Sequence, residues 1–303
     1  MTPLERATDA LARYAGSDDL WLKREDVHEL GAFKWRATLP VVSAFVGAGH
    51  AAVVTSSTGN HGAAVAWACR QLGVAAVVFV PPGAAERKLA LLGELGADVR
   101  VAGTDLDEAK EVARAYADDA GLPFFEDGAE PLQYEAYGAI ADEILDQSPV
   151  TPGTVVTPIG NGALAGGIGA ALRRRASGVR HVGVVAEEMP VMAASHEAGE
   201  PVDVDAGSTV ADGLAVRVAI PLAVSRLNAV VDDIVRVSER AIADALVVCH
   251  DADVLVEPSA AAALAAARNG YDGPVVLVMT GRNVDPGLVA RAHEHPESFA
   301  GSG

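Results

Sequence analysis

The stretch Trp21–Arg36, WLKREDVHELGAFKWR, sets the interpretation of the whole chain, because it places the amine of Lys34 between the bulky residues Phe33 and Trp35. Only four lysines occur among the 23 basic residues, at Lys23, Lys34, Lys88 and Lys110. Arginine stays protonated, whereas a desolvated lysine can lose its proton and act as a nucleophile or imine partner. Lys34 is therefore either a reactive amine or an ordinary surface lysine with a buried stem.

Length and composition bound the class of protein. The 303 residues are enough for two domains, and half of them are apolar, which predicts a large core. No apolar run approaches the roughly 20 residues of a membrane span, and the N-terminus has no apolar signal region, so we expect a cytoplasmic protein with no membrane partner. Cys69 and Cys249 lie in helix-like apolar patterns and are expected as core thiols, not a disulfide.

The charge pattern excludes one class of partner. The formal net charge is −18, whereas proteins that bind nucleic acid carry basic stripes, so we expect no nucleic-acid partner. The run Arg173–Arg175 is expected to end a helix.

Strands alternate with helices along most of the chain, which predicts βαβ units and mainly parallel sheets. Expected strands are 51–55, 75–80, 98–101, 154–157, 181–186, 230–237 and 275–279, and expected helices include 63–72, 86–95, 105–117 and 132–146. Leu4, Ala7, Leu11 and Tyr14 have helical spacing and predict a helix over 1–20 that ends at Gly16. The alanine-rich segment Pro258–Arg268 is expected as a fully buried helix.

Three polar turns follow expected strands, where the ligands of open parallel sheets bind. The first, Ser57–Gly62, offers hydroxyls, the Asn60 amide and a helix N-terminus to a carboxylate or phenolate, although a plain capped helix start is the alternative. The second, Gly160–Gly167, has the small residues of a phosphate-binding turn. A dinucleotide site with Glu187 as its ribose acid is the alternative there, but the glycine spacing is one residue off. The third is Thr280–Asn283, otherwise a simple turn.

Other catalytic patterns are missing from the sequence. It contains no HExxH motif, no cysteine pair at zinc spacing and no G-x-S-x-G motif. The segment His293–His295 is expected to be solvated.

Taken together, the motifs resemble fold-type II pyridoxal-phosphate enzymes, in particular the threonine/serine dehydratase group with serine racemase. The matching segments occur in the family's order: LKRED with GAFKWR, STGNHG, PIGNGALAGG, VADGLAV, VDDIVRVSE, VEPSAAAALAA and MTGRNVD. The resemblance implies a fold like that of the tryptophan synthase β-chain, with two α/β domains and the cofactor between them. We expect a large domain at 1–40 and 130–303, a small domain at 41–129 that carries the asparagine turn, and a homodimer.

The resemblance also implies roles for single residues. Lys34 holds the coenzyme pyridoxal 5'-phosphate as an imine (Schiff base) and moves protons at the substrate Cα, while Phe33 shapes the pocket. Asn60 bonds the ring hydroxyl, and Thr280 bonds the pyridine nitrogen. The substrate carboxylate is received by the turn formed by Ser57, Thr58, Gly59, Asn60 and His61. The phosphate is held by the N–H groups of Gly160, Asn161, Gly162, Ala163 and Leu164.

A neutral hydroxyl at Thr280 favours α,β-elimination over a long-lived carbanion, because an aspartate there would keep the ring nitrogen protonated. We therefore predict an ammonia-lyase of amino-acid metabolism that converts a β-hydroxy amino acid, as threonine and serine dehydratases do, to a 2-keto acid and ammonia.

Ala32, Asn161 and Ala163 depart from the dehydratase pattern. Threonine synthase-like chemistry, diaminopropionate ammonia-lyase activity and racemisation stay open as alternatives. The racemase metal site would need an acid at Ala193, so no such metal is expected.

Overall fold

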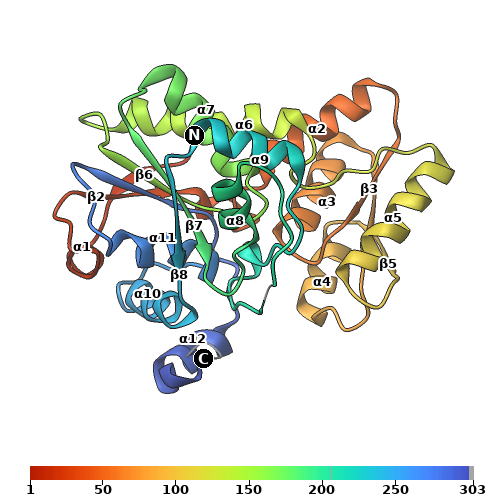
Figure 1. The fold of residues 1–303 in the computed structure, drawn as a ribbon. Helices are drawn as coiled ribbons and strands as arrows, with labels where there is room; N and C mark the ends of the chain where they lie inside the picture. The colour runs from red at the N-terminus through yellow and green to blue at the C-terminus, as the bar shows by residue number, and fades with distance from the viewer. Residues whose placement is uncertain (206, 300–303) are drawn as a thin grey trace. The chain divides into compact units, whose positions relative to one another are not determined.

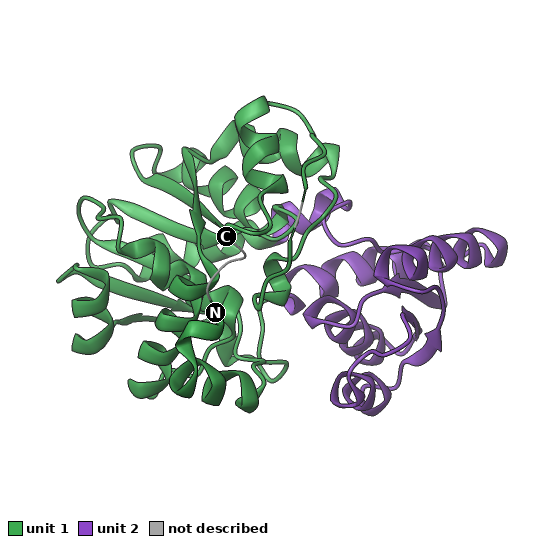
Figure 2. Ribbon diagram, turned by 60° about the horizontal axis from the view of Figure 1, so that its bottom comes forward, with its two compact units in different colours: residues 1–33, 137–303 green, residues 34–136 purple. Residues whose placement is uncertain are grey.

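The chain packs as two compact units, which Figure 2 colours separately. This computed structural model describes residues 1–205 and 207–299. Unit 1 contains Met1–Phe33 and the chain from Tyr137 onward, and unit 2 is Lys34–Ala136. The chain enters unit 2 between Phe33 and Lys34 and leaves it within helix α6 (Pro131–Gln147). The predicted domains, 1–40 with 130–303 and 41–129, stay a prediction.

Unit 1 is built on a six-stranded sheet whose order is β1-β2-β9-β6-β7-β8 (Figure 1). The strands are β1 (Leu4–Arg6), β2 (Leu20–Arg24), β6 (Thr154–Pro158), β7 (Arg180–Ala186), β8 (Asp233–Val237) and β9 (Val275–Met279). Every neighbouring pair is parallel except β1 with β2. The carboxyl ends of the parallel strands therefore lie at one edge of the sheet.

The alternation of side chains along β7 shows why both faces of this sheet are covered. Val182 and Val184 face one core, and Val185 faces the other. The first core includes α1 (Asp9–Ala15), α10 (Glu239–Asp251) and α11 (Pro258–Ala267). The second includes α7 (Ala163–Arg175), α8 (Val191–Ala198) and α9 (Pro221–Val230). Helix α12 (Pro286–Glu294) and the 3-10 turn η3 (Pro296–Phe299) follow and contact α10, while the 3-10 turns η1 (Glu25–Val27) and η2 (Asp212–Leu214) lie in connecting segments.

Helix α11 confirms the expectation of a fully buried helix. Each of its residues, Pro258 to Ala267, is buried. Helices normally bury a stripe and leave a polar face to water, so a helix made almost entirely of alanine can be covered on every side. Its small side chains let neighbouring elements approach closely.

Unit 2 is a three-layer arrangement around the parallel sheet β3-β4-β5. Its strands are β3 (Ala52–Ser56), β4 (Ala75–Val80) and β5 (Asp98–Val101). One face packs on α2 (Trp35–Gly47), α3 (Asn60–Leu72) and α4 (Glu86–Glu94), and the other packs on α5 (Leu106–Ala120). The predicted mainly parallel α/β fold is thus confirmed in both units.

The expectation of a helix over residues 1–20 was wrong for the first third of that range. Residues Leu4–Arg6 form β1, antiparallel to β2, and the helix begins only at Asp9. The Thr8 side chain accepts from the Leu11 N–H and caps the helix, and Glu5 forms an ion pair with Arg24 across the strand pair. The predicted end at Gly16 is confirmed, because Gly16 adopts the left-handed conformation at the C-cap.

The two thiols behave as expected. Cys69 and Cys249 are free and buried, and burial raises the pKa of each to about 12. Among the described residues, no helix is both long enough and apolar enough to span a bilayer.

Candidate active site

Lys34 is the first residue of unit 2 and lies directly ahead of α2. Its side chain is 16 % exposed, and its Nζ donates to Oδ2 of Asp127 at 2.5 Å. A charge-assisted bond of this length fixes the position of the amine. The alternative of a freely solvated surface lysine does not match this environment.

Asp127 is engaged at both of its carboxylate oxygens. Oδ2 accepts from Lys34, and Oδ1 accepts from Nε2 of Gln133 at 3.0 Å. Burial opposes ionisation of this carboxyl, but the charge of Lys34 and the hydrogen bonds from Lys34 and Gln133 outweigh it and hold the pKa of Asp127 well below its usual range. The pair is therefore an ionised, partly buried carboxylate that accepts a hydrogen bond from the amine.

His61 adds an acceptor to the same cluster. Its ring is 5 % exposed, and burial lowers its pKa, so the ring is neutral. Nε2 lies 3.3 Å from the carbonyl oxygen of Phe125, which can only accept, so Nε2 carries the proton. Nδ1 is then an acceptor that lies 3.6 Å from Oδ1 of Asp127, and among the described residues no hydrogen-bond donor reaches it.

The turn Ser57–Gly62 connects β3 to the N-terminus of α3 in unit 2. The Ser57 hydroxyl oxygen accepts from the Gly59 N–H at 3.1 Å, which closes the turn. A Cβ atom at Gly62 would lie 2.5 Å from the carbonyl oxygen of Ser57, so only glycine fits there. The structure thus places Asn60 as the first residue of α3, where backbone N–H groups and the helix dipole attract an anion.

The glycine turn of unit 1 connects β6 to the N-terminus of α7. Gly162 is the N-cap, with φ of 95°, and the Ala163 N–H donates to Oδ1 of Asn161 at 3.0 Å. A Cβ atom at Gly160 would lie 2.2 Å from the carbonyl oxygen of Gly213, so the turn is packed against its neighbour without space for a side chain. The first N–H groups of a helix have no partner inside it, so this turn can hold a phosphate.

Thr280 follows β9 at the carboxyl end of the same sheet and is 3 % exposed. Its Oγ1 donates to Oε1 of Glu257 at 3.4 Å, and its carbonyl oxygen accepts from the Phe33 N–H at 3.0 Å. The Phe33 ring packs on Tyr137 with centroids 5.1 Å apart. This backbone hydrogen bond holds Phe33 next to Thr280 within unit 1.

Two residues of these clusters, Asp127 and Glu257, were given no role in the sequence analysis. No spacing rule marks them, since each meets its partner only through the fold. His61 was predicted as part of the substrate turn, but the contact of its ring with Asp127 was not. The one available signal for Asp127 was an acidic residue after the buried pair Phe124–Phe125. The roles predicted for Lys34, Asn60, Thr280 and the glycine turn stay predictions.

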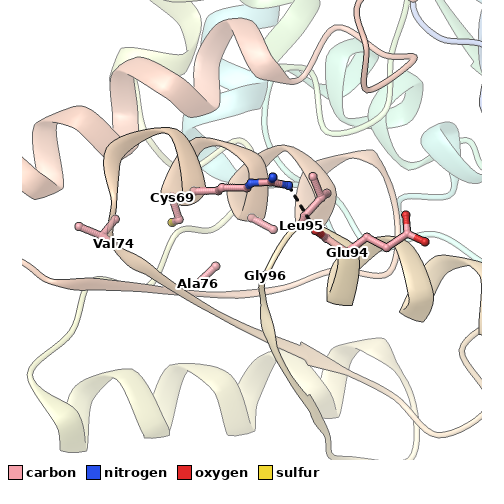
Figure 3. A pocket seen from close by; sticks show the side chains of 8 residues that line it. Cys69, Val74, Ala76, Glu94, Leu95 and Gly96 are labelled. Carbon is pink, nitrogen blue, oxygen red and sulfur yellow. Dashed lines mark hydrogen bonds between the residues drawn. The ribbon is translucent and has the colours of Figure 1, made fainter.

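A separate pocket of about 280 Å³ lies in unit 2 between α3, β4 and the end of α4 (Figure 3). Cys69, Val74, Ala76, Glu94, Leu95 and Gly96 line it, and Arg70 donates to the Glu94 carbonyl oxygen there. It contains none of the residues predicted to bind the coenzyme or the substrate. With a buried thiol and a backbone-bonded guanidinium, it offers no reactive group.

Each unit, taken by itself, offers side chains and helix ends that suit one part of a coenzyme that carries an aldehyde, a phosphate and a pyridine ring. Unit 2 supplies a fixed amine and an amide-bearing turn, and unit 1 supplies an anion-binding helix N-terminus and a buried hydroxyl. Lys34 would hold the aldehyde carbon, the Gly160–Leu164 turn the phosphate, Asn60 the ring hydroxyl and Thr280 the ring nitrogen.

Comparison with known proteins shows the family of this chain. Residues 1–281 match the family model described as pyridoxal-phosphate dependent enzyme. The chain is 32 % identical over 278 residues to the L-threonine ammonia-lyase of Thermotoga maritima, which covers 90 % of this chain and 69 % of that protein. The processed form of threonine deaminase isoform 2 from Solanum lycopersicum has a similar structure, with a TM-score of 0.90, 27 % identity, and coverage of 97 % of this chain and 87 % of that one.

Maize serine racemase is also similar in structure, with a TM-score of 0.87 and 26 % identity over 98 % of this chain and 93 % of that one. The order of motifs, the fold of both units and the family match agree with one another. The chain therefore belongs to the fold-type II pyridoxal-phosphate dependent enzymes, within the group of threonine dehydratases and serine racemases.

Proposed function

We propose that this enzyme is a lyase that removes ammonia from a β-hydroxy amino acid by α,β-elimination. The observation that carries the proposal is the Lys34 amine, which is 16 % exposed and held 2.5 Å from the ionised Asp127. A positioned amine of this kind can take a proton from carbon once it has lost its own.

The coenzyme supplies the electron withdrawal that makes the substrate Cα proton acidic. The N-terminus of α3, with the hydroxyls of Ser57 and Thr58, binds the substrate carboxylate and orients the amino acid. Lys34 takes the Cα proton, and the β-hydroxyl leaves as water after it has received a proton. The elimination leaves an enamine, which takes up one water and releases the 2-keto acid and ammonia. Because the elimination itself released one water, no net water is consumed.

Asp127 acts on Lys34 in this scheme. The carboxylate accepts a hydrogen bond from Nζ and keeps the amine in one orientation, while Nε2 of Gln133 donates to the other carboxylate oxygen and holds the carboxylate in place. The Thr280 hydroxyl, which here donates to Glu257 at 3.4 Å, would turn its single proton to the ring nitrogen. A neutral hydroxyl at this position favours proton removal coupled to loss of the β-substituent.

A second candidate substrate is a 2,3-diamino acid, which would lose its β-amino group in the same reaction. The carboxylate of Asp127 and the acceptor Nδ1 of His61 favour an ammonium group near Lys34. The same negative charge disfavours a phosphorylated substrate such as phosphohomoserine, which weakens the threonine synthase-like alternative. Action on the cytoplasmic amino-acid pool and a homodimeric state stay predictions.

The first experiment tests the coenzyme attachment. We expect purified protein to be yellow, and borohydride reduction followed by peptide mapping should fix the chromophore on Lys34. Lys34→Ala should lose turnover by at least a thousandfold, whereas Lys88→Ala, at a half-buried position of α4, serves as the control. Full turnover by Lys34→Ala would remove the proposal.

The second experiment identifies the substrate. Threonine, serine, 2,3-diaminopropionate and phosphohomoserine are assayed for keto acid, ammonia and phosphate release. Keto acid and ammonia in equal amounts from threonine or serine support a hydroxy amino acid. Two ammonia per keto acid from the diamino acid alone would favour the second candidate, and phosphate release would overturn both.

A further inference from the structure

Two exposed histidines and one exposed aspartate converge in unit 1, and none of them belongs to the candidate active site. His250 and Asp251 end α10, and His293 lies in the last turn of α12. The two helices contact one another and are drawn next to each other in Figure 1. Oδ1 of Asp251 lies 3.6 Å from Nδ1 of His250 and 3.3 Å from Nε2 of His293.

These separations match the ligand spacing of a divalent metal ion. Imidazole nitrogens and carboxylate oxygens lie about 2.0–2.2 Å from zinc, so two ligands of a tetrahedral ion are roughly 3.4 Å apart. The three ligand atoms all lie within 4.8 Å of one another. Small side-chain rotations would therefore bring all three onto one ion.

The helix ends supply an independent reason for a cation at this place. The C-terminus of a helix carries a partial negative charge, and here the last turns of α10 and α12 lie together. The imidazole rings of His250 and His293 pack edge to face with centroids 5.4 Å apart, so both rings are already oriented by the fold. All three side chains are exposed, which leaves room for water to complete the coordination.

We propose that His250, Asp251 and His293 bind one transition-metal ion of the zinc class, and that the ion ties α12 to α10. Two imidazoles with one carboxylate are ligands that zinc accepts, whereas calcium and magnesium prefer oxygen alone. The site is separate from the coenzyme-binding residues, so the ion has a structural role and takes no part in the lyase reaction.

The test uses full-length holoenzyme from which any affinity tag has been removed. Zn²⁺ titrated by calorimetry should bind with one equivalent per chain, and Co²⁺ should give a visible absorption band of a four- or five-coordinate ion. His250→Ala, Asp251→Asn and His293→Ala should each weaken Zn²⁺ binding at least tenfold. His295→Ala is the matched control, because this exposed histidine is two residues from His293 and pairs with Glu297 instead.

Thermal unfolding gives a second readout, since a ligand that binds only the folded state raises the unfolding temperature. Saturating Zn²⁺ should raise it for the wild type and His295→Ala but not for His293→Ala. Absence of stoichiometric binding in the wild type overturns the site. Equal binding by wild type and His293→Ala does so as well, and would leave the cluster as a surface ion pair.

Discussion

At the scale of single residues, Asp127 has the largest consequence for chemistry. A carboxylate 2.5 Å from an amine lowers the energy of one orientation of that amine and restricts the others. The constraint matters because proton transfer from carbon requires the base to be aligned with the bond that breaks.

Replacing Asp127 with Asn should lower kcat by about tenfold to a thousandfold while borohydride still fixes one coenzyme per chain. The amide keeps the size of the side chain but loses the charge that holds Nζ. Steady-state kinetics and the trapping stoichiometry measure the two effects separately. Glu126→Gln is the control, because Glu126 pairs with Lys110 and Arg114 instead of Lys34. Unchanged kcat in Asp127→Asn would contradict the positioning role.

His181 is a buried group that couples stability to pH. It is 1 % exposed, its Nε2 is 3.0 Å from the Thr157 hydroxyl, and burial lowers its pKa from 6.5 to about 4. The unfolded chain therefore takes up a proton at a higher pH than the folded one, and folding is favoured less as the pH falls.

The free energy of unfolding should accordingly decrease by about 3 kcal/mol as the pH falls from 6.5 to 4, and this contribution should level off below pH 4. Urea unfolding at a series of pH values measures it. His181→Gln keeps a polar side chain that cannot titrate, so its stability should vary less over this interval. A variant with the same pH dependence as the wild type would show that other groups dominate.

At the scale of elements, the N-terminus of α7 leaves no space for a larger residue. Gly162 has φ of 95°, and a Cβ atom there would lie 2.8 Å from Cδ1 of Leu227. A side chain at this position would strain the backbone and displace the turn that is proposed to hold phosphate.

Gly162→Ala should therefore cost about 1–3 kcal/mol of unfolding free energy and weaken coenzyme binding at least tenfold. Urea unfolding and titration of the apoenzyme with pyridoxal 5'-phosphate measure the two losses. Gly178→Ala, placed in the turn after α7 where no atom lies within 4 Å of the added carbon, should change neither. Wild-type affinity in Gly162→Ala would remove the turn from the coenzyme site.

Elements differ in how far the sequence predicts them. The parallel sheets are predictable because apolar strands alternate with helices along the chain, and α11 is predictable because an apolar alanine-rich segment can only be buried. The strand β1 is not, because Leu4 and Ala7 fit a helical period by chance and only pairing with β2 decides between the two structures. Asp127 and Glu257 are not predictable for the same reason, since their partners Lys34 and Thr280 are distant in sequence.

At the scale of the whole molecule, the net charge of −18 should make stability depend on salt. Carboxylates outnumber basic groups by 41 to 23, so we expect net repulsion among the surface charges. Raising NaCl from about 0.05 to 0.5 M should move the urea midpoint upward, because screening shortens the range of repulsion. Sucrose at equal osmolality is the control, and a midpoint that falls with salt would show that ion pairs such as Arg24–Glu5 dominate.

The complete burial of α11 has a consequence for how this protein can diversify. In a saturation library, an ordinary amphipathic helix tolerates replacements on every third or fourth position, which gives its fitness profile a helical rhythm. Helix α11 has no solvent-facing side, so larger residues should be destabilising at all ten of its positions. The helical periodicity of tolerated substitutions should therefore be absent there.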